Sequence, residues 1–200
     1  MPSTLHDYSG FDPALYQLRY PAAGDPLLAQ RIAVLLSDQG WVATTNGARG
    51  LDHGAWVPLR YLYPQAQLPV LQLSMPIALN TESALQLGRA LRPLRSEGVL
   101  IVGSGSLTHN LREFRAPIRD REYAQEFVDW VRPAVLNRDA QALGDYRLRA
   151  PHAARAHPSE EHFLPLLIAL GASYEGDPIR WLDGGISDQV LSMDSVLFGT

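Results

Sequence analysis

The stretch from residue 99 to residue 112 limits the possible folds of this chain more than any other. It begins with four apolar residues at 99–102, continues through a Gly/Ser turn at 103–106 and reaches His109. A continuous apolar run closed by glycines is typical of a strand buried on both faces of a parallel α/β sheet. Ligands of such sheets gather beyond the carboxyl ends of the strands, where His109 would stand. The stretch therefore predicts a buried strand that delivers one imidazole to a site.

Helix and strand signals alternate through the first half of the chain. Asp12 and Asp25 each precede a proline and predict a short helix at 13–18 and an amphipathic helix at 26–38. Short apolar runs predict strands at 41–45 and 69–74, and helical patterns occur at 55–63 and from Thr81 onward. This order is the βαβ pattern. We expect an α/β fold in a single domain, with a mixed, largely parallel central sheet flanked by helices.

The second half of the chain is predicted to be mostly helical, with strands at its end. Helices are expected at 121–135 and 139–146, a loop at 151–158, and strands at 179–182 and 189–198. Between them, Ser159 is predicted to cap a helix whose first turn holds two acids and His162. On that helix His162 would share a face with Leu166 and Leu170, so its imidazole is expected to point inward.

Composition excludes several classes of protein. A net charge of −4 with no basic stripe argues against a dedicated nucleic-acid binder, because phosphate contacts need clustered Lys or Arg. The chain has no cysteine, so disulfides, thiolate nucleophiles and Cys-based metal sites are excluded together. The sequence shows neither a long apolar run nor a signal-peptide pattern, and we expect a cytoplasmic protein without membrane contact.

Three histidines stand where chemistry is expected. His53 follows Asp52 in a Gly-rich loop, His109 follows the apolar run, and His162 lies on the predicted capped helix. Their spacing is too wide for a local metal motif such as His-Glu-x-x-His, so only the fold could bring them together. A hydrogen-bonded structural role is the alternative for each of them. The Gly/Ser turn matches neither the Gly-x-Ser-x-Gly elbow of hydrolases nor a phosphate-binding loop.

Seven stretches of the sequence resemble the class III extradiol ring-cleaving dioxygenases, and in particular their 4,5-DOPA dioxygenase group. The stretches follow the family order over nearly the whole chain. They are HDYSGF at 6–11, YPAAG at 20–24, GLDHGAW at 50–56, PVLQLS at 69–74, the segment 98–112, EHFLPLL at 161–167 and the end at 192–199.

The resemblance implies one catalytic domain over residues 1–200, an oxidoreductase that opens the ring of a catechol with O2. It implies a non-haem metal, Fe(II) for activity and often zinc as isolated. By motif, His162 resembles a metal ligand, and His109 resembles the acid/base that assists deprotonation of the catechol. His53 resembles a second catalytic histidine near substrate and oxygen. The substrate-binding residues implied are His6, Tyr8 and Asp52.

The sequence also departs from the family. Family members begin with a His-Gly-Ser-Pro segment and a Ser-Ala-His-Trp segment, whose histidines are the other two metal ligands, and neither occurs here. Divalent sites of this kind need about three protein ligands. We therefore expect weak metal binding and impaired activity by this chain alone. We also expect an exposed apolar sheet edge that a second copy or a partner chain covers, or that sequence upstream of Met1 completes.

Two other hypotheses stay open at this point. The chain could be a metal-free small-molecule-binding or interaction module derived from this family. Alternatively, His53, His109 and His162 could regroup into a substitute tri-histidine metal site.

Overall fold

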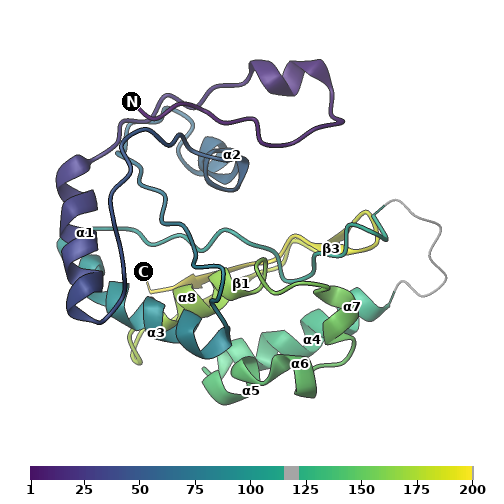
Figure 1. Cartoon of the computed structure of the whole chain (residues 1–200). Coiled ribbons are helices and arrows are strands. Elements are labelled where there is room, and N and C mark those ends of the chain that lie inside the picture. The colour runs from purple at the N-terminus through teal and green to yellow at the C-terminus, as the bar shows by residue number, and fades with distance from the viewer. Residues whose placement is uncertain (115–121, 200) are drawn as a thin grey trace. The chain divides into compact units, whose positions relative to one another are not determined.

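A computed structural model of the chain describes residues 1–114 and 122–199, so the first residue of the predicted helix at 121–135 lies outside the described residues. The chain divides into two compact units, Met1–Pro76 and Ile77–Thr200 (Figure 1).

Each helix of the first unit is capped by the aspartate that precedes it. The helices are the 3-10 helix η1 (Pro13–Gln17) and the α-helices α1 (Pro26–Asp38) and α2 (His53–Leu62). Asp12, Asp25 and Asp52 each accept a hydrogen bond from a backbone N–H of the first turn, at 2.8, 2.9 and 3.2 Å. These caps satisfy N–H groups that have no partner within the helix. The first two helices confirm the prediction, and α2 begins two residues earlier than expected because Asp52 caps it.

The core of the first unit fixes the start of α2 to the beginning of the chain. Tyr20, Leu51 and Trp56 are buried together there. The Leu5 N–H donates to the Leu51 carbonyl at 2.8 Å, which accompanies a single parallel bridge between Thr4 and Leu51. The Trp56 indole N–H donates to the Leu5 carbonyl at 2.8 Å. The segment just after Leu5 is therefore held close to the first residues of α2.

The second unit is built mainly of helices. They are α3 (Thr81–Leu91), the 3-10 helix η2 (Arg92–Glu97), α4 (Tyr123–Leu136), α5 (Ala140–Gly144), α6 (Tyr146–Arg149), α7 (Ala153–Ala156) and α8 (Leu164–Ala172). Helices α3 and α8 lie side by side (Figure 1). A Cβ atom added to Gly88 would stand 2.1 Å from the Ile168 carbonyl oxygen, so this contact needs a glycine. In the described part of the chain, no helix combines the length and apolar character that a membrane crossing requires.

The strands of the second unit form two antiparallel pairs. Strand β1 (Ile179–Leu182) pairs with β4 (Ser195–Phe198), and β2 (Ile186–Ser187) pairs with β3 (Leu191–Ser192). The predicted strand at 179–182 is confirmed, but the one at 189–198 is two strands. Asp194 lies between them, and its carboxylate accepts N–H groups of Gly184 and Gly185 at 2.6 and 3.1 Å. These hydrogen bonds join the break between β3 and β4 to the break between β1 and β2 on the opposite side of the pairing.

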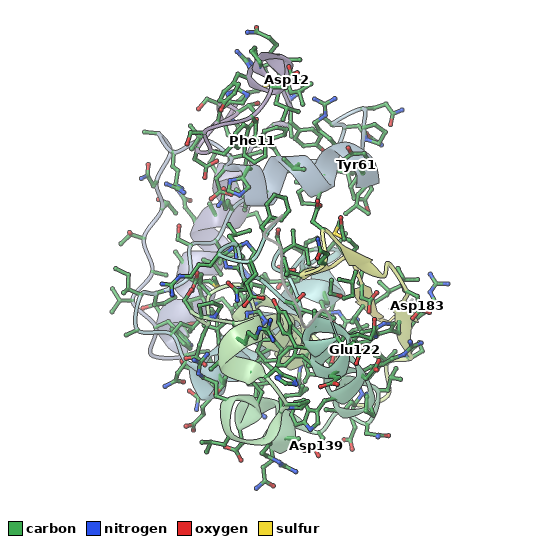
Figure 2. The ribbon with its side chains drawn as sticks, turned by 90° about the vertical axis from the view of Figure 1, so that its right-hand side faces the viewer. Phe11, Asp12, Tyr61, Glu122, Asp139 and Asp183 are labelled. Atoms are coloured by element: carbon green, nitrogen blue, oxygen red, sulfur yellow. The ribbon has the colours of Figure 1, made fainter. Side chains whose placement is uncertain are left out.

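Arg132 of α4 holds the end of β1. Its guanidinium lies 5.5 Å from the centre of the Trp181 ring and donates to Asp183 at 2.6 Å. Asp183 follows β1 and is labelled in Figure 2. Because the Arg132–Asp183 pair is exposed, its contribution to stability is small, and the burial of Trp181 contributes more.

The predicted largely parallel central sheet is not found among the described residues. The segments 41–45, 69–74 and 99–102 belong to no strand, and the only parallel pairing there is the Thr4–Leu51 bridge. A strand exists only through hydrogen bonds to a neighbouring strand. The backbone on either side of 100–105 bonds instead to carbonyls of Leu94 and His162. The side chains of Leu100 and Val102 stay 58% and 47% exposed, as expected for an apolar sheet edge without a neighbour.

Candidate functional site

Two of the three predicted histidines lie side by side in the second unit. The rings of His109 and His162 are stacked, with their centroids 3.4 Å apart and their planes 11° apart. His109 follows the apolar run, and His162 stands in the turn before α8. As the wide spacing of the two residues required, the fold and not a local motif brings them together.

The Gly/Ser turn allows this approach. A Cβ atom on Gly103 would lie 2.3 Å from the Pro165 carbonyl oxygen, and one on Gly105 would lie 2.3 Å from the His162 carbonyl oxygen. Real side chains cannot approach a backbone oxygen so closely, so any other residue would push the turn away from α8. The two glycines therefore serve the contact between the His109 loop and the His162 turn.

Hydrogen bonds hold the His109 loop on three sides. The Ser106 N–H donates to the His162 carbonyl at 2.9 Å, and the His109 N–H donates to the Ala156 carbonyl at 2.8 Å. On a third side, the fully buried Thr108 hydroxyl accepts the N–H of Ser192 at 2.8 Å. The loop is thus attached to α7, to the turn before α8 and to β3. Such attachment keeps the loop in one position.

The helix predicted from Ser159 begins later, at Leu164. The Ser159 hydroxyl donates to Glu161 at 2.8 Å and caps no helix. The His162 carbonyl accepts from Ser106, and Pro165 has no N–H to donate into a preceding turn. His162 therefore lies in a turn, where its backbone and its ring both meet the His109 loop.

A fourth histidine, His157, binds this loop from the buried core, and the sequence did not predict a functional role for it. It is fully buried, and its Nε2 donates to the Leu107 carbonyl at 2.7 Å. Burial lowers the pKa of His157 to about 4, although the hydrogen bond to the Leu107 carbonyl acts in the opposite direction. His157 is therefore neutral near pH 7. No local pattern could have indicated this role, because Leu107 is distant in sequence.

The third predicted histidine, His53, lies in the first unit and is paired with Asp7. Its Nδ1 donates to the Asp7 carboxylate at 2.9 Å, and its backbone N–H donates to the same oxygen at 3.1 Å. Although burial acts to raise it, the pKa of Asp7 is lowered by these hydrogen bonds from His53. An ionised carboxylate only accepts, so Nδ1 carries a proton, and in the neutral form of the ring the lone pair is on Nε2. Asp7 was not predicted as a functional residue, because 46 positions separate the pair.

His6 and Tyr8 place aromatic surface next to this pair. The Tyr8 ring lies edge-on to His53 with centroids 5.8 Å apart, and the His6 ring lies 5.7 Å from that of Trp56. Such edge-to-face arrangements suit aromatic ligands as well as aromatic cores. Tyr8 also packs against the buried cluster that contains Trp56.

Asp52 has its carboxylate engaged within the unit. One oxygen caps α2 through the Ala55 N–H, and the other accepts from Arg49 at 3.2 Å and from the Gln72 amide. These contacts hold the Gly-rich loop at the start of α2. Although Asp52 precedes His53 directly in the sequence, these contacts give its carboxylate a supporting role.

The part of the chain that the structure describes contains no three-ligand metal centre. Over residues 1–114 and 122–199, no group of three or more His, Cys, Asp or Glu side chains is arranged to hold a metal ion. The tri-histidine site considered from the sequence would join His53 of the first unit to His109 and His162 of the second, and it stays a prediction. His162 has His109 as its ring neighbour, which is two imidazoles where about three ligands are needed.

Comparison with known proteins decides the family. Residues 2–188 match the family described as the catalytic LigB subunit of aromatic ring-opening dioxygenase. The chain belongs to this family. The resemblance to class III extradiol dioxygenases seen in the sequence is confirmed.

Relatives of the ring-opening dioxygenase family cover nearly all of this chain. A 4,5-DOPA dioxygenase extradiol of Beta vulgaris is 43% identical over 98% of this chain and 74% of its own length. A 4,5-DOPA dioxygenase extradiol of Escherichia coli (strain K12) is 37% identical over 99% of this chain and 74% of its own. The crystal structure of an uncharacterized protein from Escherichia coli K12 is similar with a TM-score of 0.79 at 35% identity, covering 91% of this chain and 76% of that one. The chain thus spans about three quarters of the length of each.

Proposed function

We propose that this chain is an extradiol ring-cleaving dioxygenase that opens DOPA-like or other catechols with O2. The observation that carries the proposal is the stacking of His109, in a loop attached on three sides, against His162 in the turn before α8. Family membership supports the same reaction class. Residues 1–200 are proposed to act as one catalytic domain.

In this proposal His109 takes and returns protons of the catechol hydroxyls. An imidazole titrates close to neutral pH, so it can accept a hydroxyl proton and release it later. The hydrogen bond from the His109 N–H to the Ala156 carbonyl fixes the backbone that carries the imidazole.

His53 is proposed as the second catalytic histidine. Because Asp7 binds its Nδ1–H, the Nε2 of His53 is the atom that accepts a proton from substrate or an oxygen-derived group. His6 and Tyr8 are proposed to contact the aromatic ring of the substrate, and Asp52 is proposed to act on substrate binding through the loop that it holds.

The metal expected for this family is Fe(II), with zinc as the metal often retained on isolation. We propose His162 as a ligand and infer that this chain by itself binds metal weakly and has impaired activity, because its described side chains supply no three-ligand set. Metal analysis of the purified chain tests this part. About one tightly held Fe or Zn per chain would contradict weak binding.

We further propose that a second copy of the chain covers the exposed edge at 99–102 and completes a largely parallel sheet. The support is the exposure of Leu100 and Val102, which carry apolar side chains on a segment without strand neighbours. Sedimentation velocity measures the oligomeric state of the chain directly. A monomer over the whole accessible concentration range would overturn this part.

Oxygen uptake tests the proposed reaction. The purified chain is loaded with Fe(II) under anaerobic conditions and then mixed with aerated L-DOPA, caffeate or protocatechuate. A yellow ring-opened product that forms with stoichiometric O2 uptake, and that His109→Ala does not form, is expected. If wild type and His109→Ala both bind a catechol but consume no O2, the chain is instead a small-molecule-binding module of this family.

A further inference from the structure

The carbonyl of Leu107 is the point where the His109 loop meets the buried core of the second unit. Leu107 is 6% exposed, and its carbonyl accepts the Nε2–H of the fully buried His157 at 2.7 Å. Two residues further, the His109 N–H donates to the Ala156 carbonyl at 2.8 Å. Neighbouring residues 156 and 157 thus hold the loop at two points on either side of Thr108, which binds Ser192.

The surroundings of His157 determine where its ring points. Three aromatic rings meet the imidazole at steep angles, with centroids at 5.6 Å for Phe127, 6.1 Å for Tyr146 and 5.3 Å for Phe163. The His157 carbonyl in turn accepts from Arg147 at 2.9 Å. The backbone and the ring of His157 are therefore both fixed. A core position so enclosed by aromatic groups would be filled at least as well by an apolar side chain, so the hydrogen bond is what histidine adds.

We propose that His157 is a positioning residue for His109. Its Nε2–H holds the Leu107 carbonyl, and this contact fixes the position of the loop in which the His109 ring stacks on His162. A carbonyl only accepts, so His157 must carry its proton on Nε2, and the imidazole is held in a single tautomer. The functional part of the inference rests on the proposed role of His109 in ring cleavage, whereas the hydrogen bond to Leu107 and its effect on the loop do not.

Two substitutions separate positioning from packing. In His157→Gln, the side-chain amide nitrogen stands near the former Nε2 and can still donate to Leu107. In His157→Met, the cavity is filled but the donor is lost. Val131→Ala serves as the control, because it truncates a fully buried side chain of α4 in the same unit and removes no hydrogen bond of the loop.

The first measurement is hydrogen exchange of residues 106–110, which needs no activity. Exchange in His157→Met should be about tenfold faster or more than in wild type, whereas His157→Gln should stay near wild type. Val131→Ala should change exchange in the loop no more than elsewhere in the unit. Nitrogen NMR of wild type should show His157 only as the Nε2–H tautomer at neutral pH.

The second measurement is catechol turnover by the iron-loaded protein. His157→Met should lower kcat by about tenfold to a hundredfold with little change in KM, and His157→Gln should recover most of it. Equal loop protection in the Met and Gln variants, or an Nδ1–H tautomer of His157, would overturn the inference. Inactivity of wild type together with the predicted exchange pattern would reject the proposed reaction and leave the positioning of the loop established.

Discussion

The depressed pKa of His157 makes a quantitative prediction about acid stability. The pKa of His157 is lowered by burial from 6.5 to about 4 in the folded chain. The unfolded chain therefore binds a proton at this residue between those values while the folded chain does not. The free energy of unfolding that depends on a neutral His157 is fully present above pH 6.5 and is lost as the pH falls toward 4. At about 1.4 kcal/mol per pH unit, the loss from this one group is about 2 kcal/mol at pH 5 and about 3 kcal/mol in all.

The substitution His157→Gln isolates this contribution, because glutamine can donate to Leu107 but does not titrate. Urea denaturation, followed by circular dichroism at several pH values from 7.5 to 4.5, gives the free energy of unfolding of both proteins. The difference between wild type and His157→Gln should shift by about 2 kcal/mol in favour of the variant between pH 7.5 and pH 5. Carboxylates titrate equally in both and cancel. Parallel curves over this range would refute the buried, neutral state assigned to His157.

Three further predictions concern the two histidine sites. Gly105→Ala should reduce the free energy of unfolding by about 1–3 kcal/mol in urea denaturation, because its methyl group would overlap the His162 carbonyl, and an unchanged stability would contradict the close approach. Asp7→Asn should convert His53 from a single Nδ1–H tautomer to a mixture in nitrogen NMR, and identical spectra for both proteins would count against the pairing. His109→Ala should abolish turnover and leave any bound metal in place, while His162→Ala should lose metal; the reverse pattern would exchange the two assignments.

Local signals in the sequence predicted much of the helical structure. Asp12 and Asp25, each followed by proline, marked the starts of η1 and α1, because capping depends only on residues within one turn. The helix predicted from Thr81 was found as α3, and the predicted strand at 179–182 as β1. Such predictions succeed because the interactions that decide them are close in sequence.

Predictions that depend on distant residues were less complete. The apolar run at 99–102 has strand character, but a strand needs neighbours, and none of the described residues supplies one. The helix containing His162 was predicted to start at Ser159. Because the His162 carbonyl binds the N–H of Ser106, His162 stays in a turn and the helix begins only at Leu164. The charges and periodicity around Ser159 carry no information about that distant contact.

The histidine pairings show the same limit. Sequence reasoning chose His109 and His162 and the structure stacks them, but neither Asp7 as the partner of His53 nor His157 as the support of Leu107 was predicted. Both are hydrogen bonds across many residues between groups that are ordinary in their local context. A histidine beside a proline in an Ala-rich stretch gives no sign that it is enclosed by aromatic rings.

Isotopically labelled O2 tests the proposed reaction most directly. The iron-loaded chain is incubated with a catechol in an atmosphere of labelled O2, and the product is analysed by mass spectrometry. If the chain is an extradiol dioxygenase, the product is the ring-opened compound with both atoms of one O2 molecule, and His109→Ala forms none of it. A product with one labelled atom or none, or equal product from His109→Ala, would contradict the account.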